Sequence, residues 1–287
     1  MYLRQILAAL LPLVTVVVAW QSPQYNGYTR RWQATFIGQA DALPNSNNWN
    51  VINSAQVYNN ELQRYTNKKA NIRFNGNGAL QLIPRRDATA PGGWTSGRIE
   101  SKYTLTPTAG KITRVESSLR IAGNPQKNKQ GLWPAFWMLG ASYRQGVKWP
   151  ECGEIDIMEN INGQSIGYGV VHCDKGPGGA CNEPIGLAST TALPDNQFHV
   201  WRVEIDRTNS DFKKQTITWY MDDVQFHRVT GEQVNNSGVW ATLAQKPLYI
   251  ILNVAMGGDW AGSPNANTWG GTGSMMEIGY VAHYVSN

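Results

Sequence analysis

The sequence predicts an all-β fold, a β-sandwich or jelly roll with one concave sheet. The first observation is composition: glycine, tryptophan and tyrosine are abundant, and only 16% of the 287 residues are charged, which is typical of extracellular β proteins. The second is that runs of alternating polar and apolar residues recur, separated by glycine, asparagine and proline. The third is that few stretches show helical periodicity.

The first nineteen residues predict a secretory signal peptide. Arg4 supplies the basic start, residues 6–18 are largely apolar, and small residues precede a cleavage point after Ala19. An uncleaved membrane anchor is the alternative, but the stretch is short for a full span. We therefore expect a secreted, extracellular protein with one domain, residues 20–287.

Several later segments are expected to be strands. Residues 216–221 and 224–229 flank Asp222-Asp223 and predict a hairpin. Residues 248–254 are apolar throughout, which predicts a strand covered on both faces. Only short helical turns are expected, around 141–145. The other expected strands, in chain order, are 115–121, 154–159, 199–206 and 276–285.

The hexapeptide Glu-Ile-Asp-Ile-Met-Glu at 154–159 places three carboxylates on one expected strand. Side chains of a strand alternate between its faces, so Glu154 and Asp156 share a face and Glu159 has the opposite parity. One extra residue, a β-bulge at the Ile-Met pair, would return Glu159 to the acidic face. Like charges held together raise each other's pKa and cost stability, which favours an acid/base function.

This arrangement suits glycoside hydrolysis with retention, which needs two carboxyl groups about 5–5.5 Å apart. One attacks the anomeric carbon, and the other protonates the leaving oxygen and then activates water. Glu154 and Glu159 can supply the pair, with Asp156 between them to hydrogen-bond a neighbour and hold their pKa values apart. The spacing alone leaves open which glutamate is the nucleophile.

The hexapeptide resembles the Glu-x-Asp-x-x-Glu signature of glycoside hydrolase family 16, which groups laminarinases, lichenases, agarases and related β-glycanases. The resemblance implies a jelly-roll catalytic domain over residues 20–287, with a substrate cleft across its concave sheet. It implies Glu154 as nucleophile, Glu159 as acid/base and Asp156 as assistant. Other stretches similar to the family, in the family's order, are 61–66, 96–101, 131–139, 149–153 and 252–258, and 172–183 is similar to secreted fungal members.

The two residues between Asp156 and Glu159 are typical of the laminarinase-like branch of that family. The resemblance therefore implies a secreted, retaining endo-β-glucanase that hydrolyses β-1,3- or mixed β-1,3/1,4-glucans. A transglycosylase or a β-galactan-directed relative with the same machinery remains an alternative. A non-catalytic glucan-binding protein is less favoured, because such relatives typically lose the acids that are present here.

Flat aromatic side chains suit the apolar faces of sugar rings. Trp133 and Trp137 have the same strand parity, and the resemblance favours substrate contact over core packing for both. Trp260, after a Gly-Gly turn, is a further candidate sugar platform. Trp94 is a weaker one, while Trp201 and Trp219 are expected in the core.

Three polar residues are candidates for substrate contact. The family pattern places His172 near the cleaved bond. Arg98 and Asn60 could hydrogen-bond sugar hydroxyls, although a structural turn contact is almost as well supported for each. No cofactor or catalytic metal is expected. Some relatives bind a structural calcium ion, for which this sequence assigns no ligands. The segment at residues 276–284 also lacks the Asp and Arg that many family members have near their C-terminal end.

The cysteines predict one disulfide, and the charge distribution indicates which partners the protein has. An oxidising compartment permits one disulfide, for which Cys173 and Cys181 are favoured because they bracket a Gly/Pro-rich loop, leaving Cys152 buried and free. The net charge of +5 is spread along the chain, which indicates a solvated surface and no nucleic-acid partner. We expect a monomer whose partner is β-glucan polysaccharide, with no membrane contact after signal cleavage.

Overall fold

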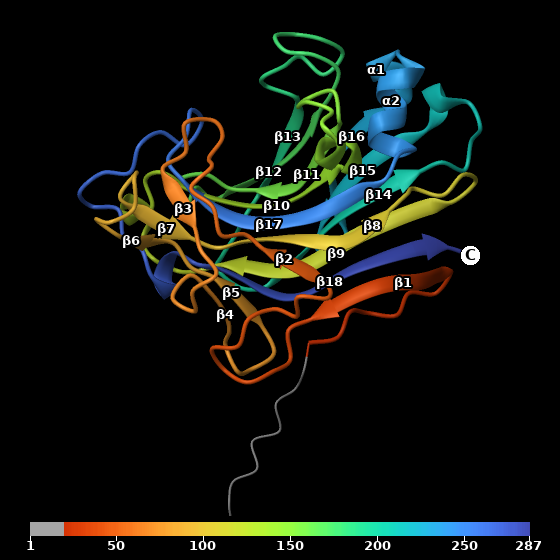
Figure 1. Ribbon diagram of the computed structural model, residues 1–287. Coiled ribbons are helices and arrows are strands. Elements are labelled where there is room, and N and C mark those ends of the chain that lie inside the picture. The colour runs from red at the N-terminus through yellow and green to blue at the C-terminus, as the bar shows by residue number, and fades with distance from the viewer. Residues whose placement is uncertain (1–19) are drawn as a thin grey trace, which may run out of the picture.

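A computed structural model describes residues 20–287 as a β-sandwich of two antiparallel sheets (Figure 1). The predicted signal peptide lies outside the described residues. One sheet, here the β11 sheet, has the order β13-β12-β11-β10-β17-β8-β2. Its strands are β2 (Trp49–Val51), β8 (Arg98–Leu105), β10 (Leu132–Gly140), β11 (Glu154–Glu159), β12 (Ile166–His172), β13 (Leu187–Ala192) and β17 (Leu248–Met256).

The opposite sheet, here the β9 sheet, has the order β16-β15-β14-β9-β18-β5-β4, and β1 also pairs with β18. Its strands are β1 (Tyr28–Thr35), β4 (Ile72–Phe74), β5 (Leu80–Leu82), β9 (Ile112–Ile121), β14 (His199–Asp206), β15 (Thr216–Met221), β16 (Val224–Thr230) and β18 (Met276–Ser286). A small third sheet joins β3 (Gln63–Tyr65), β7 (Trp94–Ser96) and β6 (Arg85–Arg86). The predicted all-β class is confirmed.

The core lies between the two large sheets and follows from strand alternation. Ile155 and Phe136 of the β11 sheet are fully buried, as are Trp201 and Trp219 of the β9 sheet. The two tryptophans therefore lie in the core, as predicted. Every residue of β17 is buried, which confirms a strand covered on both faces.

The helical content is small but exceeds the short turns expected from the sequence. The turn at η2 (Ala141–Gln145) is confirmed as a 3₁₀ helix. The α-helix α2 (Ser237–Ala244) was not predicted. It contains a glycine and β-branched residues, which lower helix propensity, yet the Asn236 side chain caps it by accepting from two backbone amides, and Trp240 and Leu243 are buried. The remaining helices are α1 (Gly231–Val234), η1 (Gln126–Asn128), η3 (Phe212–Lys214) and η4 (Thr272–Ser274).

Two further sequence predictions are confirmed by the covalent structure and the turns. Cys173 and Cys181 form a disulfide, and Cys152 is a buried free cysteine. Asp222 and Asp223 both have left-handed backbone angles at the tip of the β15–β16 hairpin, as a tight hairpin turn requires. Within residues 20–287, no helix has the length and apolar character needed to span a membrane.

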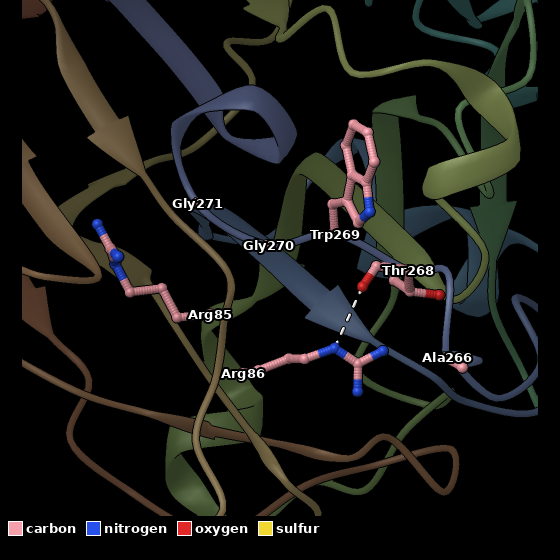
Figure 2. Close-up of a pocket in the computed structure, with 7 residues that line it drawn as sticks. All are labelled: Arg85, Arg86, Ala266, Thr268, Trp269, Gly270 and Gly271. Atoms are coloured by element: carbon pink, nitrogen blue, oxygen red, sulfur yellow. Dashed lines mark hydrogen bonds between the residues drawn. The ribbon is translucent and has the colours of Figure 1, made fainter.

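A hollow of about 370 Å³ lies beside β6, between Arg85, Arg86 and the loop that carries Trp269 (Figure 2). Its polar groups are engaged in holding the fold: Arg86 donates to the backbone carbonyls of Thr268 and Asn265, and its guanidinium lies over the buried Trp94 ring. None of the predicted acids lines this hollow.

Candidate active site

A β-bulge in β11 brings the three acids to one face. Glu154 pairs with Leu139 of β10, Asp156 with Trp137 and Glu159 with Ala135. Between the first and last of these pairs, β11 advances by one residue more than β10, and the register also shifts against β12. Because directly paired residues point to the same face, all three acids face the side that Trp137 occupies. The bulge inferred from the parity of Glu159 is confirmed.

The bulge is tied to the opposite sheet by a hydrogen bond that crosses the core. The indole N–H of Trp219, on β15, donates to the backbone carbonyl of Asp156 at 2.7 Å. A bulge interrupts the regular ladder, and a buried carbonyl without a partner is costly. Trp219, predicted only as a core residue, therefore also fixes the backbone beneath the acids.

Glu159 contacts Trp133, the first of three aromatic side chains that pack against one another. The indole N–H of Trp133 donates to Glu159 Oε1 at 2.8 Å. Burial raises the pKa of Glu159, while the Trp133 hydrogen bond partly opposes the shift. Trp260 meets Trp133 edge-on at 5.4 Å between ring centroids and meets Tyr168 of β12 at 4.9 Å, and it stays 40% exposed. An exposed aromatic surface thus adjoins Glu159.

Glu154 and Asp156 both hold their protons more tightly than ordinary carboxyls. Burial raises the pKa of Glu154 to about 7, with the charge of Glu159 adding and that of His172 opposing. Burial and the neighbouring glutamates hold the pKa of Asp156 well above its ordinary value. Its Oδ2 atom has no hydrogen-bond partner among residues 20–287. Interacting carboxyls whose pKa values are raised in this way titrate as a group and can supply both an acid and a base near neutral pH.

His172 links these acids to a buried carboxylate that sequence reasoning missed. Its Nδ1 atom lies 2.7 Å from Glu183 Oε2, and its Nε2 atom lies 3.7 Å from Asp156 Oδ2. Glu183 is buried and also accepts from the Cys173 amide at 2.8 Å. Burial lowers the pKa of His172, but the Glu183 hydrogen bond and the charge of Glu154 outweigh it, so the pKa is raised. Together, Glu154, Asp156, Glu159, His172 and Glu183 form what we call the acid cluster.

Metal binding must be weighed for part of this cluster. Glu154, Asp156 and His172 each offer one ligand atom, and these atoms lie within 4.8 Å of one another. A metal needs a neutral imidazole, whereas the raised pKa of His172 favours its protonated form. The raised carboxyl pKa values likewise favour proton sharing among these groups over cation binding.

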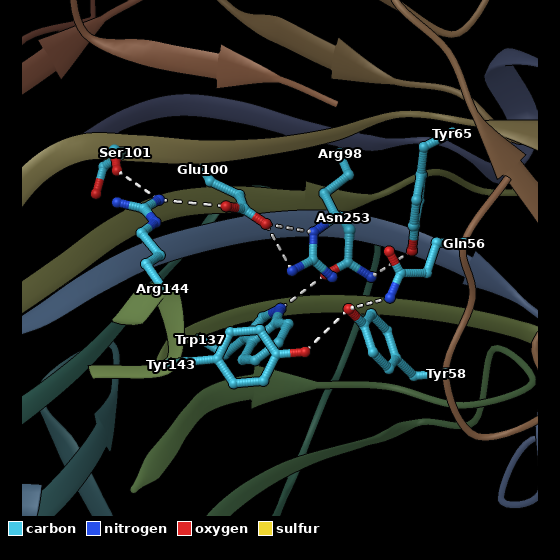
Figure 3. Close-up of polar contacts among 10 residues, drawn as sticks. All are labelled: Gln56, Tyr58, Tyr65, Arg98, Glu100, Ser101, Trp137, Tyr143, Arg144 and Asn253. Carbon is cyan, nitrogen blue, oxygen red and sulfur yellow. Dashed lines mark hydrogen bonds and ion pairs between the residues drawn. The ribbon is translucent and has the colours of Figure 1, made fainter. Parts of the chain in front are cut away.

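On the other side of β10, polar residues are paired with opposite charges or amides (Figure 3). Trp137 Nε1 donates to Asn253 Oδ1 at 2.7 Å, and Asn253 donates to the Tyr65 hydroxyl at 3.1 Å. Arg98 lies over the Trp137 ring at 5.1 Å and pairs with Glu100 at 2.8 Å. Arg98 therefore reaches the site face, but its hydrogen bonds go to Glu100.

The other candidates divide between the site and the scaffold. Asn60 is exposed, has a left-handed backbone, and donates to Asp259 Oδ1 at 2.8 Å, which is a turn contact. Trp94 is buried and cannot serve as a platform. Trp149, which sequence reasoning did not select, is 41% exposed and lies 5.5 Å from the His172 ring. Its position directly before a proline in the 149–153 stretch was the available signal.

Comparisons with known proteins agree with this geometry. Residues 96–199 match the model of a family described as "XgeA-like, catalytic GH16 domain". An endo-1,3-β-glucanase structure from Streptomyces sioyaensis is 33% identical, with 93% of this chain and 99% of that one covered and a TM-score of 0.86. An endo-β-1,3-glucanase structure from Pyrococcus furiosus is 31% identical, with 91% and 95% covered and a TM-score of 0.71.

Curated protein sequences also match this chain, at lower identity than the two structures do. A β-glucanase from Rhodothermus marinus is 28% identical over 244 residues, which cover 80% of this chain and 78% of the relative. Several other curated relatives are much longer, and the matched region spans only 33 to 38% of their length.

Proposed function

Because the chain belongs to glycoside hydrolase family 16, we propose that it is a retaining endo-β-glucanase that hydrolyses β-1,3-glucans and mixed β-1,3/1,4-glucans. Two of the most similar solved structures are β-1,3-glucanases, and the chain spans nearly all of each. The observation that carries the proposal is the bulge in β11, which presents three acids with raised pKa values on one face.

In the proposed reaction, ionised Glu154 attacks the anomeric carbon of a glucan bound over Trp133 and Trp137. Protonated Glu159 donates its proton to the leaving glycosidic oxygen, so the bond breaks and a glycosyl ester forms on Glu154. Glu159, now ionised, takes a proton from water, and the resulting hydroxide displaces Glu154. Two inversions give overall retention.

Asp156 and His172 act on the nucleophile through charge. A protonated Asp156 adds no negative charge beside Glu154, and a protonated His172 opposes the charge that remains. Both effects favour one ionised carboxylate among Glu154, Asp156 and Glu159 at a time, which is the state that the first step requires. The direction of the Glu154 and Glu159 assignment rests on the family resemblance.

We further propose that the enzyme acts outside the cell as a monomer. The apolar stretch at residues 6–18 and the Cys173–Cys181 disulfide support an oxidising, extracellular setting. An extracellular enzyme would meet polymeric glucans that do not cross a membrane.

The test is incubation of the purified protein with laminarin, lichenan, cellulose, agarose and galactan, followed by product identification. We expect oligosaccharides from laminarin and lichenan, with the β-configuration at the new reducing end when NMR records the first products. Absence of product from every β-glucan contradicts the proposal, products longer than the substrate indicate transfer, and product from galactan alone indicates the galactan-directed alternative.

A further inference from the structure

Two tyrosines from separate loops meet over the site face (Figure 3). Tyr143 lies in η2, directly after β10, and Tyr58 lies in the loop between β2 and β3. The Tyr143 hydroxyl donates to the Tyr58 hydroxyl at 2.9 Å, and Gln56 Nε2 donates to the same oxygen at 3.1 Å. We call the Tyr58–Tyr143 contact the tyrosine bridge.

The bridge rests on the same face of the β11 sheet that carries the acids. The Tyr143 ring packs with Trp137 against a buried cluster that includes Leu139 and Ile251. Leu139 pairs with Glu154, and Ile251 pairs with Trp137, so both point to the acid-bearing face. Tyr143 therefore covers the part of this face that β10 and β17 form.

The Tyr143 end of the bridge is fixed to the sheet. Next to Tyr143, Arg144 donates to Glu100 at 3.2 Å and to the Ser101 carbonyl at 3.1 Å, and its guanidinium lies 3.6 Å from the Tyr249 ring centroid. These contacts fasten η2 to β8 and β17. The Tyr58 end remains 44% exposed, so the bridge has one side against the sheet and one side in solvent.

The site face is consequently asymmetric about β11. On the β12 side, Trp149 is 41% exposed beside His172. Trp260 is 40% exposed and spans β11, since it meets both Trp133 of β10 and Tyr168 of β12. Both tryptophans can receive sugar rings. On the opposite side, the order β11-β10-β17-β8 means that a glucan extending past Trp137 meets the tyrosine bridge.

We propose that the tyrosine bridge is a specificity-determining barrier that limits how many sugar units bind between the acids and β8. The fragment released from that side is therefore short, and the β12 side holds the longer part of the glucan. The inference rests on the proposed function, since it concerns the same site and the same substrate class.

The experiment uses β-1,3-glucan oligosaccharides of defined length, labelled at the reducing end, so that each product shows which bond was cleaved. Tyr58→Ala and Tyr143→Ala open the bridge, and Tyr58→Phe removes only the hydroxyl that accepts from Tyr143 and Gln56. We expect both alanine variants to move the preferred bond by at least one sugar unit, in one direction only. The double variant should resemble the stronger single variant, because either change opens the same contact.

A matched control is Tyr103→Phe, which also removes one tyrosine hydroxyl contact, at 2.9 Å to His283, on a side chain outside the bridge. Its cleavage pattern should equal that of the wild type. An unchanged pattern in a double variant that melts like the wild type overturns the barrier. A shift of the preferred bond that shortens the fragment released from the bridge side overturns it as well.

Binding gives a readout that does not depend on turnover. In a Glu154→Gln background, calorimetry should show affinity that stops rising at a shorter oligosaccharide length with the bridge than without it. If this difference were found while the wild-type protein hydrolysed no glucan, the proposed function would be contradicted and the barrier retained. Equal length dependence in both forms, or no binding of any oligosaccharide, contradicts the barrier.

Discussion

The two sides of β10 handle buried charge in opposite ways. On the β11–β12 side, Glu154, Asp156 and Glu159 lie together, and His172 is the basic side chain that contacts them. On the β17–β8 side, Glu100 is paired with both Arg98 and Arg144. The ion-paired Glu100 keeps one protonation state and can hold neighbouring groups in position. The crowded carboxyls on the other side exchange protons near neutral pH, as catalysis requires.

The largest expected effect comes from removing one of the two glutamates assigned to the chemistry. Glu154→Gln and Glu159→Gln should each lower kcat on laminarin by on the order of 10³-fold or more, because each removes a group that bonds to, or exchanges a proton with, the reacting atoms. A substrate with an activated aryl leaving group separates them. It needs little proton donation, so its first step should survive in Glu159→Gln but not in Glu154→Gln.

The control for this pair is Glu232→Gln, on the exposed side of α1. It should keep wild-type kinetics on both substrates. If Glu154→Gln retained the burst of aryl product and Glu159→Gln lost it, the nucleophile assignment would be reversed.

The second effect is on stability and has opposite signs on the two sides. The pKa of Glu154 is raised from 4.5 to about 7, so the folded state loses stability as the pH rises from the unfolded toward the folded pKa, by up to about 3 kcal/mol. Glu154→Gln avoids this ionisation and should melt at a higher temperature than the wild type at about pH 8, with little difference at about pH 4. Glu100→Gln should melt at a lower temperature at about pH 8, because it leaves two arginines without their partner.

Calorimetric melting curves at both pH values provide the measurement. Destabilisation by Glu154→Gln at the higher pH would show that the carboxylate is compensated in the folded state, and the contrast between the two sides would be lost.

A smaller effect is expected from Glu183→Gln. The amide oxygen of the new side chain can still accept from the Cys173 backbone N–H. The substitution removes the hydrogen-bonded carboxylate that raises the pKa of His172. The imidazole should titrate at lower pH, and kcat/KM should fall by about tenfold near neutral pH, on the scale of one pKa unit. NMR titration of His172 and the pH profile of kcat/KM check this. A drop in activity with an unmoved His172 titration would assign Glu183 to loop structure alone.

The smallest effect concerns the hydrogen bond beneath the bulge. Trp219→Phe leaves the buried Asp156 carbonyl without its donor, which should cost about 1–3 kcal/mol of stability and lower kcat several-fold with little change in KM. Trp201→Phe is the control, since Trp201 is equally buried on the same sheet. A displaced pH profile in Trp219→Phe but not in Trp201→Phe identifies a positioning role; equal profiles would leave Trp219 as a packing residue.

The sequence was sufficient for features that depend on neighbours along the chain. The parity of Glu159 required the bulge, and the loop between Cys173 and Cys181 indicated their pairing. The Trp219 hydrogen bond to Asp156 was missed because strand alternation says which face a residue occupies, not which residue of the other sheet it meets. Glu183 was missed for a related reason: its partner His172 lies across a loop whose path two cysteines and one proline do not define.

Because Trp219 hydrogen-bonds the Asp156 carbonyl across the core, the distance between the two sheets affects the geometry of the acids. Any substitution that brings β15 nearer to β11, or moves it away, pulls on the backbone between the two glutamates and so alters their separation. Separation is what distinguishes direct attack by a carboxylate from attack by an intervening water. Selection for a new pH optimum or for transfer over hydrolysis should therefore enrich substitutions in the interior between these strands, at positions that no sugar can reach.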